Sequence, residues 1–168
     1  ALARGFDPER PNFLIRRVGW VSNHDLGCSG ISDELLLQLI DMLEASGVVH
    51  LSSESPVPAE VAGRLIDQRA ADFHHLMAHC QLVVGESATV SCEATILGVP
   101  AIYCARDRRS YLDELEQLGL LWCVRSLDPD SLRNCVHSIL ESDGDQWRSR
   151  SAAWRARLDN LVPLIAGA

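Results

Sequence analysis

The stretch LVVGESATVSCEATILGVPAIY, residues 82–103, decides the fold of this chain of 168 residues. Its first residues, 82–84, form an apolar run that is too short for a helix and predicts a buried strand. Residues 85–87 then turn the chain into a helix over about 88–97, and residues 100–104 predict a second strand. A strand, a helix and another strand in this order form the repeating unit of a parallel sheet.

The same alternation continues on both sides of this unit. Strands separated by helix-length segments indicate right-handed crossovers and a mainly parallel sheet covered on both faces. We therefore expect an α/β fold, a Rossmann-like three-layer sandwich in which residues 1–168 form a single domain. Further strands are expected at 13–18, 48–51 and 121–124, and further helices after the caps Ser32 and Asp72, near 58–64, and over 110–118, 129–141 and about 146–162.

In such sheets, ligands bind outside the carboxyl ends of the strands. The loops that follow the predicted strands are therefore the places where chemistry is expected. These loops are 19–31, 52–57, 85–89 and 104–110.

Composition excludes several classes of function. Acidic residues outnumber basic ones by 23 to 15, and the formal net charge of −8 gives no electrostatic footprint for nucleic acid, which is not expected as a partner. Every basic residue is Arg and none is Lys, which excludes a P-loop lysine and all Schiff-base chemistry. The six cysteines are scattered without a C-x-x-C pair, and the sequence shows neither a signal peptide nor an apolar run that could span a bilayer. A cytoplasmic protein is expected.

The start of the helix at 88–97 has the features of an anion site. Ser87 is a helix cap and Thr89 lies in the first turn, where backbone N–H groups have no internal partner and the helix dipole favours negative charge. One turn further on, the Glu93 carboxylate could accept two hydroxyl hydrogen bonds, as a ribose diol requires. The alternative on spacing alone is an ordinary capped helix with Glu93 in solvent.

The run Gly85-Glu86-Ser87-x-Thr89, followed by Glu93-Ala94 and residues 97–102, resembles a known motif. It is similar to the nucleotide-sugar motif in the C-terminal domain of GT-B glycosyltransferases and UDP-N-acetylglucosamine 2-epimerases. Across about residues 13–125 the chain also resembles a related bacterial and archaeal family, the domain of unknown function 354. The segments that carry this second resemblance are residues 19–25, 30–36, Ser53-Glu54, His74-His75-Leu76 and 110–115.

The resemblance implies a UDP-sugar as ligand and substrate, with no separate cofactor. It implies that Ser87 and Thr89 contact phosphate, with Ala88 between them, and that Glu93 contacts ribose. His24 resembles the histidine that lies near the diphosphate in the epimerases. The chain departs from the motif at Ala88, whose Cβ lies where a backbone would approach phosphate.

The sequence has residues for only one of the two Rossmann-like domains of a GT-B protein. We therefore expect the N-terminal domain as a missing partner and the isolated chain to be catalytically inactive. The alternative is a Rossmann-like scaffold or interaction module that has lost its ligand.

Other candidates are more isolated. His24 and Asp25 could form an acid–base pair or simply structure their loop. Of Arg106, Arg108 and Arg109, which follow the strand at 101–104, one is a candidate ligand contact, which we assign to Arg106, and the alternative is a solvated loop. His75 and His79 have the i,i+4 spacing of two metal ligands, but no third ligand follows, so a solvated helix face is preferred and no metal is expected.

The C-terminal helix carries an apolar stripe that predicts either docking on the sheet or a homodimer. The stripe consists of Trp147, Trp154, Leu158 and Leu161, with Ile165 beyond Pro163.

Overall fold

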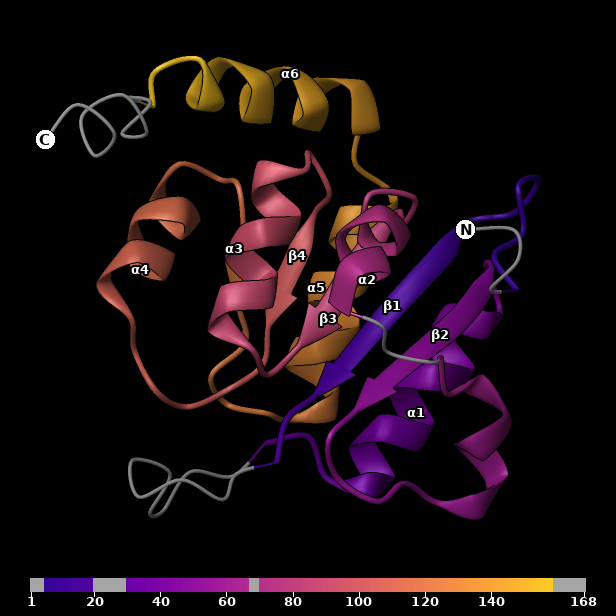
Figure 1. Ribbon diagram of the computed structural model, residues 1–168. Coiled ribbons are helices and arrows are strands. Elements are labelled where there is room, and N and C mark those ends of the chain that lie inside the picture. Colours follow the sequence, from indigo (N-terminus) through magenta and orange to yellow (C-terminus); the bar gives the residue numbers. More distant parts are fainter. Residues whose placement is uncertain (1–4, 20–29, 67–69, 159–168) are drawn as a thin grey trace, which may run out of the picture.

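The computed structural model describes residues 5–19, 30–66 and 70–158. It contains a five-stranded, entirely parallel sheet with the strand order β2-β1-β3-β4-β5 (Figure 1). The predicted α/β, Rossmann-like fold is confirmed. The strands are β1 (Asn12–Arg17), β2 (Val48–Ser53), β3 (Leu82–Gly85), β4 (Ala101–Tyr103) and β5 (Trp122–Cys123).

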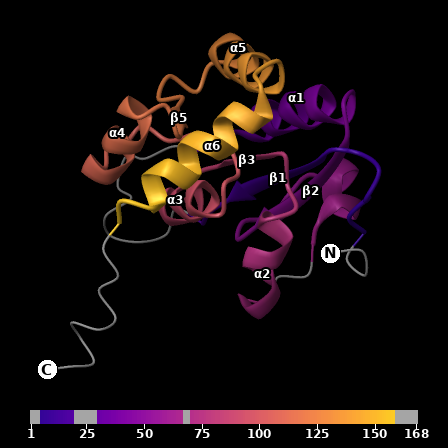
Figure 2. The ribbon, with the colours of Figure 1, turned by 90° about the horizontal axis from the view of Figure 1, so that it is seen from above.

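Helices cover both faces of the sheet. α1 and α5 pack on one face around Phe13, Ile15 and Val84, while the opposite face, with Leu14 and Val83 at its centre, is covered by α2, α3 and α4 (Figure 2). Strand residues alternate between these two cores, as a sheet buried on both sides requires. The helices are α1 (Asp33–Glu44), the 3-10 helix η2 (Ala59–Arg64), α2 (Ala70–Met77), α3 (Ala88–Ile96), α4 (Ser110–Gln117), α5 (Pro129–Leu140) and α6 (Gly144–Arg155).

Side-chain caps fix where several helices begin. Ser32 caps α1 and accepts the Leu35 N–H, and Ser87 caps α3 in the same way through the Val90 N–H. Both positions were predicted from the sequence. A cap side chain satisfies one of the N–H groups that a helix start leaves without a partner, so it favours a defined first residue.

Three predicted helices differ from the structure. Segment 58–64 forms the 3-10 helix η2, which buries only Val61. Helix α2 begins at Ala70, so Asp72 lies in its first turn, where the helix dipole favours an acid, and is not the cap. The last helix does not run over about 146–162: it begins after the Asp143 cap and ends at Arg155, because after Ser151 no residue of its described part is fully buried.

Helix α6 crosses the end of the molecule at which the strands begin (Figure 1). Its Trp147 is only 2% exposed and stacks on Trp122, while Ser151 donates a hydrogen bond to the Thr95 carbonyl of α3. Docking on the chain itself therefore accounts for much of the stripe, although Leu158 remains half exposed. Leu161, Pro163 and Ile165 lie outside the described residues. Within the described ranges, we find no helix of the length and hydropathy needed to cross a membrane.

Candidate functional site

A cavity of about 250 Å³ opens at the carboxyl end of the sheet. The strand order reverses between β1 and β3, and neighbouring crossovers there leave toward opposite faces, which in parallel sheets creates the ligand crevice. Three of the loops predicted from the sequence contribute to this cavity or adjoin it. Its lining residues are Val18 and Gly19 after β1, Glu86, Ser87, Ala88 and Thr89 after β3, and Tyr103, Asp107, Arg109 and Tyr111 at and after β4.

The start of α3 forms one wall of the cavity. The Ser87 hydroxyl accepts the Val90 N–H at 3.3 Å, while the N–H groups of Ala88 and Thr89 belong to the first turn, which has no intrahelical acceptors. The structure thus brings Ser87, Ala88 and Thr89 to one surface. These N–H groups and the positive end of the helix dipole suit an anionic oxygen.

Glu86 forms the floor of the site and ties two segments to it. Its carboxylate accepts the N–H of Val18 at 2.8 Å with one oxygen and the N–H of Ile31 with the other. The side chain is only 4% exposed, so these charge-assisted hydrogen bonds compensate for burial of the charge. In the sequence, Glu86 belongs to a turn and to the run that resembles the nucleotide-sugar motif, but no role was assigned to it. Its position between the end of a buried strand and a helix cap was the available signal.

A hydrogen-bonded series that starts at β4 also lines the cavity. The Tyr103 hydroxyl donates to one Asp107 oxygen, and the Arg109 Nε donates to the other at 2.7 Å. Burial raises the pKa of Tyr103, and its bond to Asp107 raises it further. Burial alone would raise the pKa of Asp107, but the hydrogen bonds from Tyr103 and Arg109 outweigh it and lower that pKa. The series therefore consists of a neutral phenol, a carboxylate and a guanidinium.

The other predicted site residues lie elsewhere. Glu93 is on α3 but does not line the cavity: its Oε2 lies 3.2 Å from the Nε2 of His74 on α2. Arg106 is exposed and is also absent from the lining, whereas Arg109, which was not singled out from the sequence, belongs to it. His24 and Asp25 lie outside the described residues.

Nothing in the described ranges brings three His, Cys, Asp or Glu side chains together as a metal site. His75 and His79 are both exposed on and after α2. The five described cysteines are free thiols, and burial raises the pKa of Cys80 to about 12. A thiol with so high a pKa remains protonated and is a poor nucleophile.

Comparisons with solved structures identify the class of fold. UDP-GlcNAc 2-epimerase from Neisseria meningitidis, bound to UDP-GlcNAc, is similar with a TM-score of 0.62 and 15% identity, over 89% of this chain and 41% of that one. A putative UDP-N-acetylglucosamine 2-epimerase from Listeria monocytogenes is similar with a TM-score of 0.59 and 16% identity, over 86% of this chain and 40% of that one. Spinosyn rhamnosyltransferase complexed with thymidine diphosphate is similar with a TM-score of 0.56 and 17% identity, over 88% of this chain and 41% of that one.

The chain therefore has the fold of one Rossmann-like half of these epimerases and GT-B glycosyltransferases, resembling the C-terminal half. This chain spans 41% of the length of the Neisseria epimerase and 40% of the length of the Listeria protein. No protein-family model and no curated protein matches the sequence. Membership of the domain of unknown function 354 family accordingly stays a prediction.

Proposed function

We propose that this domain binds a nucleotide-sugar, with a UDP-sugar as the expected ligand. The observation that carries the proposal is the cavity at the reversal of strand order, walled by the start of α3. Nucleotides are typical ligands of that position in Rossmann-like sheets. Support also comes from two of the similar structures, one bound to UDP-GlcNAc and one complexed with thymidine diphosphate.

In this proposal, the N–H groups of Ala88 and Thr89 and the Ser87 hydroxyl bind phosphate. Glu93 binds the ribose diol one turn further along α3, and its neighbour His74 then marks the side on which the nucleoside lies. His24 and Arg106 are proposed as additional ligand contacts, and Asp25 as the acid–base partner of His24.

Isothermal titration of the chain with UDP and UDP-GlcNAc tests the proposal. We expect binding in the micromolar to millimolar range, because one domain supplies only part of the contacts that a closed two-domain cleft makes. Absence of heat and of any thermal shift at millimolar ligand would refute it.

We further propose that catalysis, as a glycosyltransferase or a sugar epimerase, requires a second Rossmann-like domain. The neighbours support this, since their chains are more than twice as long as the matched part. The chain alone should turn over no UDP-GlcNAc, and adding a separately expressed partner domain should restore activity. Turnover by the chain alone would contradict this division.

A scaffold without ligand is the second candidate. Two observations favour it: the Ala88 Cβ at the helix start and the carboxylates of Glu86 and Asp107 in the cavity lining. The carboxylates repel a diphosphate, and the Cβ limits how closely the backbone approaches it. The titration above separates the candidates, because a scaffold shows no saturable UDP binding.

A homodimer through α6 also remains a proposal. The described stripe leaves Leu158 exposed and Trp154 half-buried, so any dimer contact in this part must use these residues. Light scattering over a concentration series, with Leu158→Ser as the variant, tests it; a mass independent of concentration would refute the dimer.

The free cysteines of the described part support the proposed cytoplasmic location.

A further inference from the structure

We propose that Arg109 binds the second phosphate of a nucleoside diphosphate, and that Tyr103 and Asp107 are positioning residues that hold Arg109 for this role. The inference rests on the proposed function and goes beyond it by assigning the cation. It commits to a phosphate, although a carboxylate on the sugar could use the same donors.

Arg109 has donors to spare. Its Nε is bonded to Asp107 at 2.7 Å, and its terminal nitrogens have no partner within the part of the chain that the structure describes. The side chain is 53% exposed and lines the same cavity as the start of α3. A guanidinium fixed at Nε presents its outer edge as a planar pair of donors, which matches two phosphate oxygens.

The positioning series begins in the core. Tyr103 is the last residue of β4, is 2% exposed, and pairs with Gly85 of β3, so its ring is fixed by the sheet. Its hydroxyl occupies one oxygen of Asp107, which leaves the other oxygen for Arg109. Since a long exposed side chain otherwise loses rotamer freedom on binding, this attachment lowers the entropic cost of placing the guanidinium.

Charge makes such a cation necessary. The cavity lining contains the carboxylates of Glu86 and Asp107, and the start of α3 offers only about half an elementary charge. Among the described residues that line this cavity, Arg109 is the one Lys or Arg. Its neighbours in the sequence are placed differently: Arg108 pairs with Asp113 at 2.9 Å, and Arg106 does not line the cavity.

The primary test compares uridine, UMP and UDP as ligands of the chain by isothermal titration. Arg109→Gln should weaken UDP roughly 10-fold, the typical worth of a charge-assisted contact, and should change UMP and uridine less than about 2-fold. Arg108→Gln is the matched control and should leave all three affinities unchanged. Equal loss for UMP and UDP would overturn the assignment to the second phosphate.

A second test separates positioning from a general structural effect. Tyr103→Phe removes only the hydroxyl, and we expect UDP to bind about 3-fold more weakly as Asp107 and Arg109 lose their fixed geometry. In the Arg109→Gln background, the same change should have no further effect on UDP. If the two losses instead multiply, Tyr103 acts independently of Arg109 and the positioning role is wrong.

The outcomes distinguish this inference from the function on which it rests. If UDP binds the unmodified chain and Arg109→Gln binds it equally well, the inference fails and the proposed function stands. If UDP does not bind the unmodified chain, the proposed function fails first. If Arg109→Gln weakens UDP-glucuronate but not UDP-glucose, Arg109 contacts a sugar carboxylate and the phosphate assignment is overturned. Arg109 is exposed, so its variant should fold even if Tyr103→Phe does not.

Discussion

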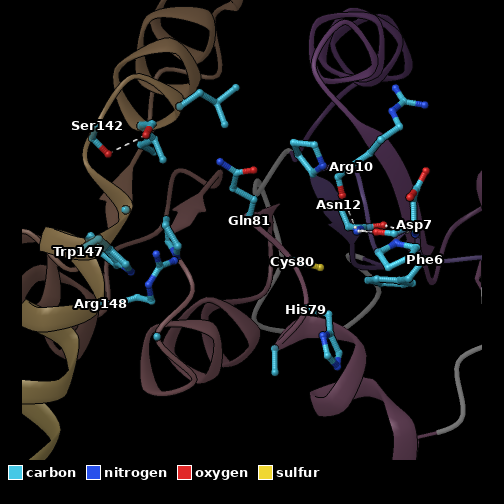
Figure 3. Close-up of a pocket in the computed structure, with 18 of the residues that line it drawn as sticks. Phe6, Asp7, Arg10, Asn12, His79, Cys80, Gln81, Ser142, Trp147 and Arg148 are labelled. Atoms are coloured by element: carbon cyan, nitrogen blue, oxygen red, sulfur yellow. Dashed lines mark hydrogen bonds between the residues drawn. The ribbon is translucent and has the colours of Figure 1, made fainter. Parts of the chain in front are cut away.

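The two ends of the sheet differ in a way that cavity size does not reveal. The amino end, beneath α6, has a groove of about 850 Å³, whereas the cavity at the carboxyl end measures about 250 Å³. Figure 3 shows the larger groove, with side chains of the segment before β1 facing those of α6. The smaller cavity nevertheless holds the candidate chemistry.

Polar groups at the amino end stabilise the chain itself. Asn12 donates to the carbonyls of Asp7 and Arg10 and accepts the Asp7 N–H, while Arg10 donates to the Gly47 carbonyl. At the carboxyl end, by contrast, the start of α3 and Arg109 line the cavity, and their N–H groups have capacity left. The start of α3 and the Arg109 guanidinium, rather than volume, mark the smaller cavity as the candidate site for an anion.

The largest expected effect comes from two glycines, one at each end. A Cβ on Gly47 would lie 2.2 Å from the Pro11 carbonyl oxygen, and a Cβ on Gly85 would lie 2.6 Å from that of Arg16. Because backbone must move in both cases, we expect Gly47→Ala to cost about 3 kcal/mol or more and Gly85→Ala about 2–3 kcal/mol. Urea unfolding measures both.

Only Gly85→Ala should also weaken UDP, because Glu86 and Ser87 follow it directly in the cavity wall. Titration at a temperature where both variants are folded checks this. Equal weakening by Gly47→Ala would show that the two ends are not independent.

Glu86 gives the next effect. Glu86→Ala leaves the Val18 and Ile31 N–H groups without their acceptor, at a cost of about 2–3 kcal/mol. Glu54→Ala is the comparison variant: Glu54 also accepts a backbone N–H, that of Gly19 at 3.0 Å, and pairs with Arg16, but its side chain is 49% exposed. Its loss should cost less than about 1 kcal/mol. Similar costs for the two variants would mean that burial of Glu86 is not what makes its hydrogen bonds important.

The sequence predicted the architecture well, because hydrophobic period and helix caps are local signals. The cap Ser32 and the strand at 82–84 were read from neighbouring residues and are confirmed by the structure. Helix ends were less predictable: Asp72 resembles a cap, yet α2 begins at Ala70 and Asp72 lies in its first turn.

Only the part of the candidate site that consists of backbone groups at a helix start could be predicted from the sequence. Ser87 and Thr89 were singled out because a helix start exposes donors wherever it occurs. The bonds of Glu86 to Val18 and Ile31 span 68 and 55 residues, so no local pattern contains them. The choice between Arg106 and Arg109 depended on side-chain direction after β4, which spacing does not determine.

Acid pH should lower the free energy of unfolding through His50, which packs near the amino end of the sheet. This side chain is 4% exposed, stacks on Phe6, and lies 3.0 Å from the Asn12 Oδ1 through Nε2. Burial lowers its pKa below the ordinary 6.5, so the unfolded chain binds a proton more readily than the folded one. The contribution of His50 to stability is full above pH 6.5 and is lost as the pH falls from there through the lowered pKa of the folded state.

Urea unfolding between pH 5 and 7.5 measures this loss. His50→Gln should flatten the profile and cost about 1 kcal/mol at pH 7.5, since the stacked ring pair is also lost. A profile for His50→Gln as steep as that of the unmodified chain would assign the pH dependence to other groups.

The smallest effect compares two helix caps, and it isolates the site from the fold. Ser87 caps α3 at the carboxyl end by accepting the Val90 N–H, and Asp143 caps α6 at the amino end by accepting the Asp145 N–H at 2.9 Å. Replacing either cap by Ala should cost about 1 kcal/mol in the free energy of unfolding. Because the two costs are alike, any difference in UDP affinity reflects where each helix begins. Ser87→Ala should weaken UDP a few-fold and Asp143→Ala should not, since of these two helices α3 begins at the smaller cavity and α6 at the larger groove. Weakening of UDP by Asp143→Ala alone would place the nucleotide in the larger groove and reverse the comparison.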